Sequence, residues 1–533
     1  MACLYEVFED RNYGVFMKKK ICKIIILVVI IVCYFENANS EIKLPALITN
    51  NMVLQRQKEI NIWGWAEVDE QVTVSIDHQE KSTITGTDGR WEIKLDPMEA
   101  SGPYEMVISG RNTIKLRNVL VGEVWICSGQ SNMQWPVRYS ANPGREIACG
   151  NHPSIRLFTV KKQGAAEPRT DCIGQWEECT PITVADFSAV AYFFGRELMK
   201  ELNVPVGLIQ SAWGGTPCES WVNLDALRVE PKLQSLLKGW EKVYKEKPRE
   251  FEEYYDLLAS WFVYAFVCMG QKKSYGEIPK PPEQYAKDTW VPSWLYNAMI
   301  APLTPFVIRG VIWYQGESNS GKAYQYRALF PTLIRDWRNK FGQGDFPFLY
   351  VQLSNLGKRE TKPVNSGWAE LQEAQLMTLK EPNTAMAVTI DIGEADDVHY
   401  KNKQDVGRRL SLGALKLAYG KNIVYSGPLY DYSDVRDGKM QIHFKHTGSG
   451  LISKNSNLLA GFAIAGADSQ FVWAKAEIDG KDVVVWNETI PNPVAVRYAW
   501  GNNPECNLYN KEGLPASPFR TDDWQRITKD KDY

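Results

Sequence analysis

The sequence predicts an α/β protein whose central domain is built on a parallel β-sheet and is flanked by β-rich segments. Three observations support this prediction. Residues 41–120 hold short apolar runs split by polar turns, residues 121–424 alternate strand-like and helix-like runs, and residues 425–533 return to short β runs. With 533 residues, the chain is long enough for two or three domains.

Residues 1–40 have the pattern of a secretion signal. A basic start at residues 17–23 precedes an apolar run, Ile24–Cys33, and the small residues Ala38 and Ser40 follow at the spacing that a signal peptidase reads. We expect translation to start at Met17, cleavage after Ser40, and a secreted or periplasmic protein. The apolar run is short for a membrane span, so we expect no transmembrane span in the mature chain.

Residues 41–120 are predicted to form a small antiparallel sandwich. Runs such as Ile60–Ala66 and Gln71–Ile76 are short, closely spaced and separated by polar turns. Residues 425–533 are predicted to form a further β-rich module.

Residues 121–424 are predicted to form the parallel-sheet domain, with helices on both faces. Strand-like runs such as Glu123–Gly129 and Arg309–Gly316 alternate with helix-like runs such as Tyr324–Gly342. Residues 222–295 interrupt this order with charged, aromatic and helical sequence. We interpret them as an insertion, a kind of segment that commonly shapes a cleft at the carboxyl ends of strands.

Composition and charge argue against a nucleic-acid partner and leave contact with sugars open. The chain has 61 basic and 63 acidic residues, whereas a nucleic-acid-binding protein usually has a clear basic excess, so no nucleic-acid partner is expected. The absence of C-x-x-C and H-E-x-x-H patterns argues against a structural or catalytic zinc, and we expect no metal and no cofactor. The 19 tryptophans and 25 tyrosines suit contact with sugars and core packing equally well. Cys172 and Cys179 are spaced for a disulfide bond across a short loop.

Two stretches are similar in sequence: EVWICSGQSNM at Glu123–Met133 and GVIWYQGESN at Gly310–Asn319. Many hydrolases present a nucleophilic serine in a Gly-x-Ser sequence directly after a buried strand. Ser131 and Ser318 both have this setting, and both lack the second glycine of G-x-S-x-G, which weakens an ordinary α/β-hydrolase interpretation. Local sequence alone does not distinguish which of the two serines is the nucleophile.

A nucleophilic serine needs a base, usually histidine, and an acid that orients it. Of five histidines, His399 stands out because it follows the strand-like run Thr384–Gly393 and precedes a helix-like run. That position is the carboxyl end of a strand, where active sites of such folds lie. Asp396 and Asp397 stand three and two residues before it. The alternative is a solvated acidic loop with an incidental histidine.

Several motifs together resemble the sialate O-acetylesterase family, within the SGNH (GDSL-like) hydrolase superfamily. They are GQSNM, WGGTP at Trp213–Pro217, WYQGESN, DDVHYKNKQDVGRRL and SWLYNAMIAPLTPF at Ser293–Phe306. The resemblance covers most of the chain after residue 40, in order and spacing. It implies a three-layer SGNH hydrolase domain at residues 121–424, flanked by β-sandwich-like modules.

The resemblance also implies a role for each motif. It favours Ser131 over Ser318 as nucleophile, His399 as base and Asp396 as acid, with Asp397 as the alternative acid and a Ser–His dyad as a further alternative. The oxyanion would be bound by the Ser131 N–H, the Gly215 N–H and the Gln315 side-chain amide, with Gly214 as the alternate glycine. Asn132 and Glu317 are expected to support the site. A hydrogen-bonded partner is expected for Glu317, since an isolated buried carboxylate is costly.

The expected function follows from these roles. It is that of a secreted serine esterase that removes O-acetyl groups from carbohydrates, foremost O-acetylated sialic acids, through an acetyl-enzyme intermediate. One alternative is an esterase for acetylxylan or another polysaccharide, which would use the same triad. A second alternative is a non-catalytic carbohydrate-binding protein, which the β-rich ends and abundant aromatic residues also fit. The oligomeric state stays open.

Overall fold

The structure, a computed structural model, describes residues 41–241, 257–261, 264–265, 268, 273, 276–279, 289–456 and 458–531. The predicted signal segment and much of the predicted insertion, including residues 242–256, lie outside these residues. Among the helices that it describes, none has the length and apolar character needed to cross a membrane.

The chain divides into two compact units, and the smaller one holds residues 63–93 and 106–115 together with the segment that ends at Leu44. In it, β3 (Gln71–Ile76) pairs antiparallel with β4 (Gln79–Ile84) and with β6 (Ser101–Ser109). Alternate residues of β3 are buried, as expected for a strand with one covered face. The predicted antiparallel β structure of this segment is confirmed. Further strands that begin before residue 120 are β1 (Val53–Gln55), β2 (Ile60–Trp65), β5 (Arg90–Leu95) and β7 (Thr113–Gly129).

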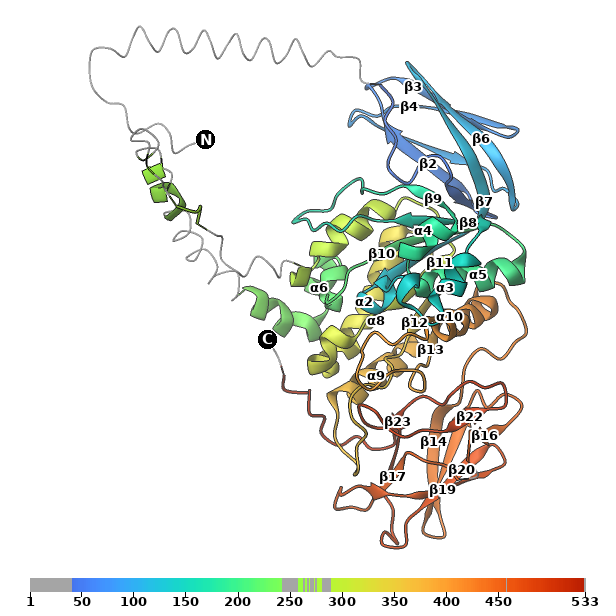
Figure 1. The fold of residues 1–533 in the computed structure, drawn as a ribbon, viewed down its shortest axis with the longest axis vertical. Helices are drawn as coiled ribbons and strands as arrows, with labels where there is room; N and C mark the ends of the chain where they lie inside the picture. Colours follow the sequence, from blue (N-terminus) through green and yellow to red (C-terminus); the bar gives the residue numbers. More distant parts are fainter. Residues whose placement is uncertain are drawn as a thin grey trace. The chain divides into compact units, whose positions relative to one another are not determined.

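The larger unit is built on a central sheet with the strand order β13-β12-β11-β7-β10-β8-β9 (Figure 1). Its strands are β7, β8 (His152–Thr159), β9 (Trp176–Cys179), β10 (Val206–Ala212), β11 (Gly310–Tyr314), β12 (Phe348–Val351) and β13 (Thr384–Ala387). Neighbouring strands are parallel, except that β9 pairs antiparallel with β8 at one edge. Residues of β10 and β11 are buried throughout, because helices cover both faces of such a sheet. The predicted parallel sheet is confirmed, and the predicted border at residues 120 and 121 lies inside the uninterrupted strand β7.

Two helix pairs form the outer layers of this sheet domain (Figure 1). Helix α5 (Ala189–Leu202) packs on α10 (Lys403–Leu417), and α8 (Ala323–Phe341) packs on α9 (Gly367–Met377). Gly407 allows the first pair to approach closely, since a Cβ there would overlap Phe193. The shorter helical segments are α2 (Ser131–Gln134), η1 (Val137–Tyr139), α3 (Pro143–Ala148), α4 (Pro181–Asp186), η2 (Cys218–Trp221), α6 (Leu224–Val229), η3 (Pro231–Leu233), η5 (Tyr296–Ile300), η6 (Ala301–Leu303), η7 (Glu317–Lys322) and η8 (Thr378–Lys380).

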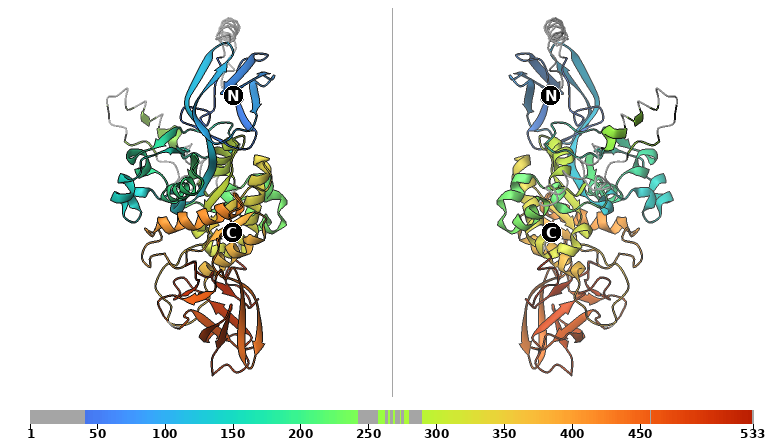
Figure 2. Two further views of the ribbon diagram at one scale, coloured as in Figure 1. Left: turned by 90° about the vertical axis from the view of Figure 1, so that its right-hand side faces the viewer. Right: turned by 90° about the vertical axis from the view of Figure 1, so that its left-hand side faces the viewer.

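The C-terminal strands belong to the same compact unit as the central sheet and lie beside α9 (Figure 1), and they form the orange-to-red group in both views of Figure 2. Arg520 and Arg526 both pair with Glu373 of α9 and tie the chain end to that helix. The strands form antiparallel groups: β14 (Leu429–Arg436), β15 (Lys439–Lys445), β20 (Asp482–Trp486) and β19 (Lys475–Asp479); β16 (Leu451–Ser453) and β22 (Leu508–Asn510); and β18 (Val472–Trp473), β17 (Phe462–Ala465), β21 (Ala495–Tyr498) and β23 (Phe519–Arg520). The predicted β-rich character of residues 425–533 is confirmed.

The disulfide bond considered between Cys172 and Cys179 is not formed. Both thiols are free and buried. Cys179 ends β9, and its thiol donates to the Gly150 carbonyl oxygen at 3.3 Å, so this sulfur is engaged there and not with Cys172.

Candidate active site

The sequence motifs meet at the carboxyl ends of adjacent parallel strands. Gly129, at the end of β7, is in register with Ala212 of β10 on one side and with Tyr314 of β11 on the other. GQSNM, WGGT and QGESN, which follow these three strands, therefore start at one edge of the sheet. This is the edge at which open α/β sheets bind ligands.

Ser131 begins the short helix α2 and is half-buried. Gly129, two residues before it, has φ +139°, and a Cβ there would overlap the Tyr314 carbonyl oxygen, so the close approach of β7 and β11 requires glycine. The Gln130 N–H donates to the same Tyr314 oxygen at 2.9 Å. Gln130 Oε1 in turn accepts a bond of 3.3 Å from the Ser318 N–H. The two similar motifs are thus hydrogen-bonded halves of one structure, in which Ser318 lies in the supporting loop.

His399 lies in the loop between β13 and α10, and two contacts join it to the turn that carries Ser131. The Asn132 side chain donates to the Val398 carbonyl oxygen at 3.0 Å. The Trp135 ring stacks on the His399 ring with centroids 4.5 Å apart and an 8° angle between planes. Within the described residues, Ser131 Oγ and His399 share no hydrogen bond, and such catalytic contacts commonly tighten only in the complex with substrate.

The acid position departs from the prediction. Asp397 Oδ1 lies 3.9 Å from His399 Nδ1 and accepts a hydrogen bond from the His399 backbone N–H at 2.7 Å. The predicted acid, Asp396, is exposed, and in the described part of the chain it forms no ion pair with His399. The reason is local, because the turn closed by the Asp397 carboxylate directs that side chain toward the histidine. The alternate, Asp397, is therefore the carboxylate beside the ring.

A buried lysine that the sequence analysis missed lies beneath the turn that carries Ser131. The Lys403 amine donates to Asn132 Oδ1 at 2.6 Å and lies 3.8 Å from the centre of the Tyr400 ring. Burial lowers its pKa to about 7, against the attraction of acidic groups of which Glu317 is the strongest. A signal was present in the sequence, since a lysine at the first position of a helix opposes the helix dipole.

Lys403 also influences the candidate base. Burial lowers the pKa of His399 from its ordinary value, and the positive charge of Lys403 lowers it further, whereas Asp397 acts in the opposite direction. The imidazole is therefore held toward its neutral form, the form in which it accepts a proton.

Glu317 has the hydrogen-bonded partner that the sequence analysis expected. Its Oε1 accepts from the Asn132 side chain at 2.6 Å, while its buried Oε2 has no hydrogen-bond partner among the residues that the structure describes. Burial raises its pKa, and the Asn132 bond and the Lys403 charge oppose that rise. Asn132 thus joins the loop after β11, the histidine loop and the start of α10.

The two candidate oxyanion glycines differ in what they can donate. The Gly214 N–H already donates to Gln134 Oε1 at 2.9 Å, and a Cβ at this position would lie 3.2 Å from Ser131 Cβ. Gly215 is exposed with φ +73°, and its N–H has no partner among the residues that the structure describes. Gly215, the first choice from sequence, is the glycine with a free donor.

Gln315 departs from its expected role. Its side chain is fully buried, and its amide nitrogen donates to the Thr216 carbonyl oxygen at 3.3 Å and to Asn319 Oδ1 at 2.6 Å. Its Oε1 accepts from the Tyr326 hydroxyl at 2.9 Å. Because both amide hydrogens are engaged, Gln315 holds the loop after β10 in place and has no free donor for an oxyanion.

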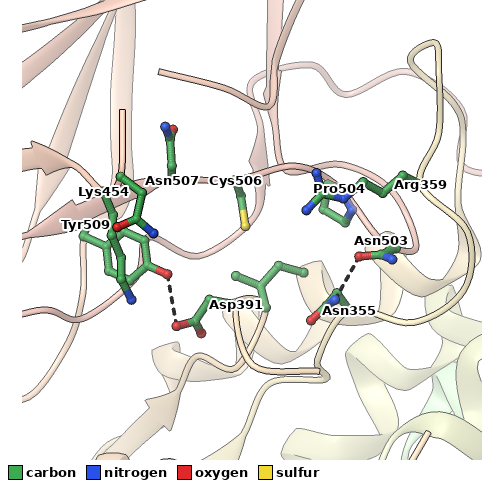
Figure 3. Close-up of a pocket in the computed structure, with 11 residues that line it drawn as sticks. Asn355, Arg359, Asp391, Lys454, Asn503, Pro504, Cys506, Asn507 and Tyr509 are labelled. Carbon is green, nitrogen blue, oxygen red and sulfur yellow. Dashed lines mark hydrogen bonds between the residues drawn. The ribbon is translucent and has the colours of Figure 1, made fainter. Parts of the chain in front are cut away.

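A polar pocket of about 220 Å³ lies where the end of β13 meets the C-terminal strands (Figure 3). Asp391 there accepts two bonds from Arg409, at 2.6 and 2.7 Å, and one from the Tyr509 hydroxyl at 3.1 Å. Asn355 donates to Asn503 at 2.8 Å on the other side of the pocket. Since these groups satisfy one another, we assign the pocket a structural role, which is to hold α10 against the C-terminal strands.

Across residues 41–241, 289–456 and 458–531 and the short described pieces between them, no three His, Cys, Asp or Glu side chains are grouped as metal ligands.

Comparisons with known proteins identify the family of the chain. A family model described as carbohydrate esterase, sialic acid-specific acetylesterase, matches residues 121–247 and 283–415. The sialate O-acetylesterase of Homo sapiens is 30% identical over 91% of this chain and 93% of its own length. This chain belongs to the sialate O-acetylesterase family. It is a carboxylic ester hydrolase.

A second relative and a solved structure are also similar to this sialate O-acetylesterase family member, and the solved structure shows that the fold is shared. The enzyme of the same name from Rattus norvegicus is 29% identical over 93% of this chain and 97% of its own length. The crystal structure of a carbohydrate acetylesterase from Xanthomonas citri matches with a TM-score of 0.78 and 35% identity, over 91% of this chain and all of that one. The predicted three-layer fold class is thereby confirmed. The family match leaves out residues 248–282, which lie inside the predicted insertion.

Proposed function

We propose that this esterase removes O-acetyl groups from carbohydrates, with O-acetylated sialic acids as preferred substrates and Ser131 as nucleophile. The observation that carries the proposal is the hydrogen bond from Asn132 to Val398, which joins the turn of Ser131 to the loop of His399. The names of the relatives supply the substrate class, since they are described as sialate O-acetylesterases and as a carbohydrate acetylesterase.

The proposed reaction has two steps. Ser131 Oγ attacks the acetyl carbon while His399 takes its proton, and the sugar oxygen leaves with that proton as the C–O bond breaks. Water then attacks the acetyl-Ser131 ester, giving a proton to His399, which returns it to Ser131 as acetate departs. Asp397, beside Nδ1, would stabilise the imidazolium. The N–H groups of Ser131 and Gly215 would bind the oxyanion, and each such donor is worth about 3 kcal/mol.

Acetate release tests the proposal. Wild-type protein, Ser131→Ala and Ser318→Ala are compared on O-acetylated sialic acids and on acetylated xylan. We expect the wild type and Ser318→Ala to release acetate from the sialic acids and Ser131→Ala to be inactive. Full activity of a folded Ser131→Ala protein would refute the nucleophile assignment.

The same comparison of substrates also distinguishes a sialic acid esterase from the alternative, a polysaccharide esterase. Preference for acetylated xylan would replace the sialic acid assignment with that of a polysaccharide esterase, which would use the same catalytic residues. The third expectation, a non-catalytic carbohydrate-binding protein, is wrong, because the family membership makes the chain an ester hydrolase.

We further propose that the protein is exported, with translation from Met17 and cleavage after Ser40. The basic, apolar and small-residue order of residues 17–40 supports this. N-terminal sequencing of protein recovered from the culture medium or periplasm should begin at Glu41. A mature chain that begins at Met1 would contradict the proposal.

A further inference from the structure

An open hollow of about 430 Å³ lies beside the candidate base. Its lining comes from the segment after α2 and from the loop after His399: Trp135, Arg138, Tyr139, Ser140, Ala141, Asn142, Pro143 and Lys401. Its size falls within the range of small-molecule sites. Trp135 belongs both to this lining and to the stack on His399, so a single side chain connects the hollow to the candidate base.

The aromatic side of the hollow suits a sugar ring. Tyr139 is 54% exposed, which is unusual for so large a side chain. Trp135 lies at its side with ring centroids 5.4 Å apart, and the Trp135 indole N–H donates to the Tyr139 carbonyl oxygen at 3.1 Å. The hydrogen bond holds the Trp135 ring in place, and the exposed Tyr139 ring beside it offers an apolar face with a polar tip.

The charged side of the hollow favours an acid. Lys401 is exposed, and its amine forms no ion pair with any residue in the described part of the chain. Its backbone is fixed, because its N–H donates to Glu394 Oε1 at 3.0 Å and its carbonyl oxygen accepts from Ala141 at 2.7 Å. The other cation of the lining, Arg138, is already paired with Asp186. One unpaired positive charge therefore remains at the rim.

We propose that this hollow holds the ring of an acidic O-acetylated sugar, with Tyr139 against the ring and the Lys401 amine paired with the sugar carboxylate. The proposal rests on the proposed function and names the residues by which the site would select an acidic sugar over a neutral one. A bound sugar here would present a neighbouring acetyl ester to Ser131 and His399.

The test compares an O-acetylated sialic acid with the same sugar carrying a methylated carboxyl group. For the wild type we expect higher kcat/KM on the free acid. In Lys401→Met that preference should fall about tenfold, through KM, as expected for loss of a charged hydrogen bond. Lys401→Glu should reverse the preference. The matched control is Lys421→Ala, an exposed lysine beyond the far end of α10, which should keep the wild-type preference.

The aromatic contact is tested separately. Tyr139→Ala should raise KM for both sugars, whereas Tyr139→Phe, which keeps the ring, should restore the wild-type KM. Thermal unfolding of every variant establishes that it is folded.

The outcomes distinguish failure of the proposed esterase function from failure of the proposed sugar site. If the wild type cleaves p-nitrophenyl acetate but neither sugar, the proposed function fails. If the wild type cleaves both sugars and Lys401→Met leaves their ratio unchanged, or Tyr139→Ala leaves KM unchanged, the hollow is not the sugar site while the proposed function stands.

Discussion

Asn132 and Val398, 266 residues apart in the chain, are joined by a side-chain to backbone hydrogen bond of 3.0 Å. Through this bond the residue after Ser131 contacts the residue before His399. The same amide accepts from Lys403 and donates to Glu317. The Asn132 side chain therefore links the turn of Ser131 to the loop of His399, and the first prediction concerns it.

Asn132→Ala should lower both activity and stability. The substitution leaves the buried Lys403 amine and Glu317 carboxylate without their shared partner, and an unsatisfied buried group typically costs about 1–3 kcal/mol. Misplacement of the serine turn by about 1 Å would lower kcat roughly 100-fold. Denaturant unfolding and acetate release measure the two effects. Wild-type values for both would show that the network does not support the site.

Asp397→Asn should lower kcat more than Asp396→Asn. Asp397 orients the His399 loop and stabilises its charged form, whereas Asp396 is exposed. Because the Asp397 carboxylate lies beyond hydrogen-bond distance from the ring nitrogen, we expect a loss of about 10- to 100-fold, well below the roughly 10⁴-fold of a tightly bonded triad acid. The matched pair is compared by kcat at constant pH. A larger loss for Asp396→Asn would restore the assignment that the D-x-x-H spacing suggests.

Alanine substitutions at Gly214 and Gly215 should have different effects on activity and stability. Alanine at Gly214 would press on Ser131 Cβ, so Gly214→Ala should lower kcat about tenfold with little change in the free energy of unfolding. Gly215 has φ +73° and open space around it, so Gly215→Ala should mainly destabilise the fold, by about 1–2 kcal/mol. Urea unfolding and steady-state kinetics of both variants check the contrast, which would be refuted by identical profiles.

Lys403→Met should move the acidic limb of the kcat/KM profile to higher pH. Lys403, with a pKa of about 7, is mostly protonated where His399 titrates, and its charge lowers the His399 pKa. Removal of the charge raises that pKa, so the base becomes protonated at a higher pH. Lys403→Arg, which keeps the charge, should leave the limb near its wild-type position. An unmoved limb in a folded Lys403→Met protein would contradict the electrostatic coupling.

The lowered pKa of Lys403 also predicts that the free energy of unfolding depends on pH. Its pKa in the folded protein, about 7, is lower than the ordinary 10.5, so between these values the unfolded chain binds more protons than the folded one. The Lys403 contribution to the free energy of unfolding should therefore rise as pH rises from about 7 to 10.5. Unfolding of the wild type and of Lys403→Met across this window should differ in slope, and parallel curves would contradict the lowered pKa.

The sequence by itself determined the parallel sheet, the β-rich ends and the strand ends that carry Ser131 and His399. These features depend on local periodicity and on short motifs, because buried parallel strands require continuous apolar runs and the close approach of β7 and β11 requires Gly129. The resemblance of the ordered motifs then distinguished Ser131 from Ser318, which local sequence could not do.

Only the tertiary structure decided the partners of the polar side chains. The bond between Lys403 and Asn132 spans 271 residues, and no local pattern predicts it. The bond from the Gln315 amide to Thr216 likewise depends on how the loops after β10 and β11 meet. Hydrogen bonds are short-ranged and directional, so they are settled only once folding has brought distant residues within about 3 Å of each other.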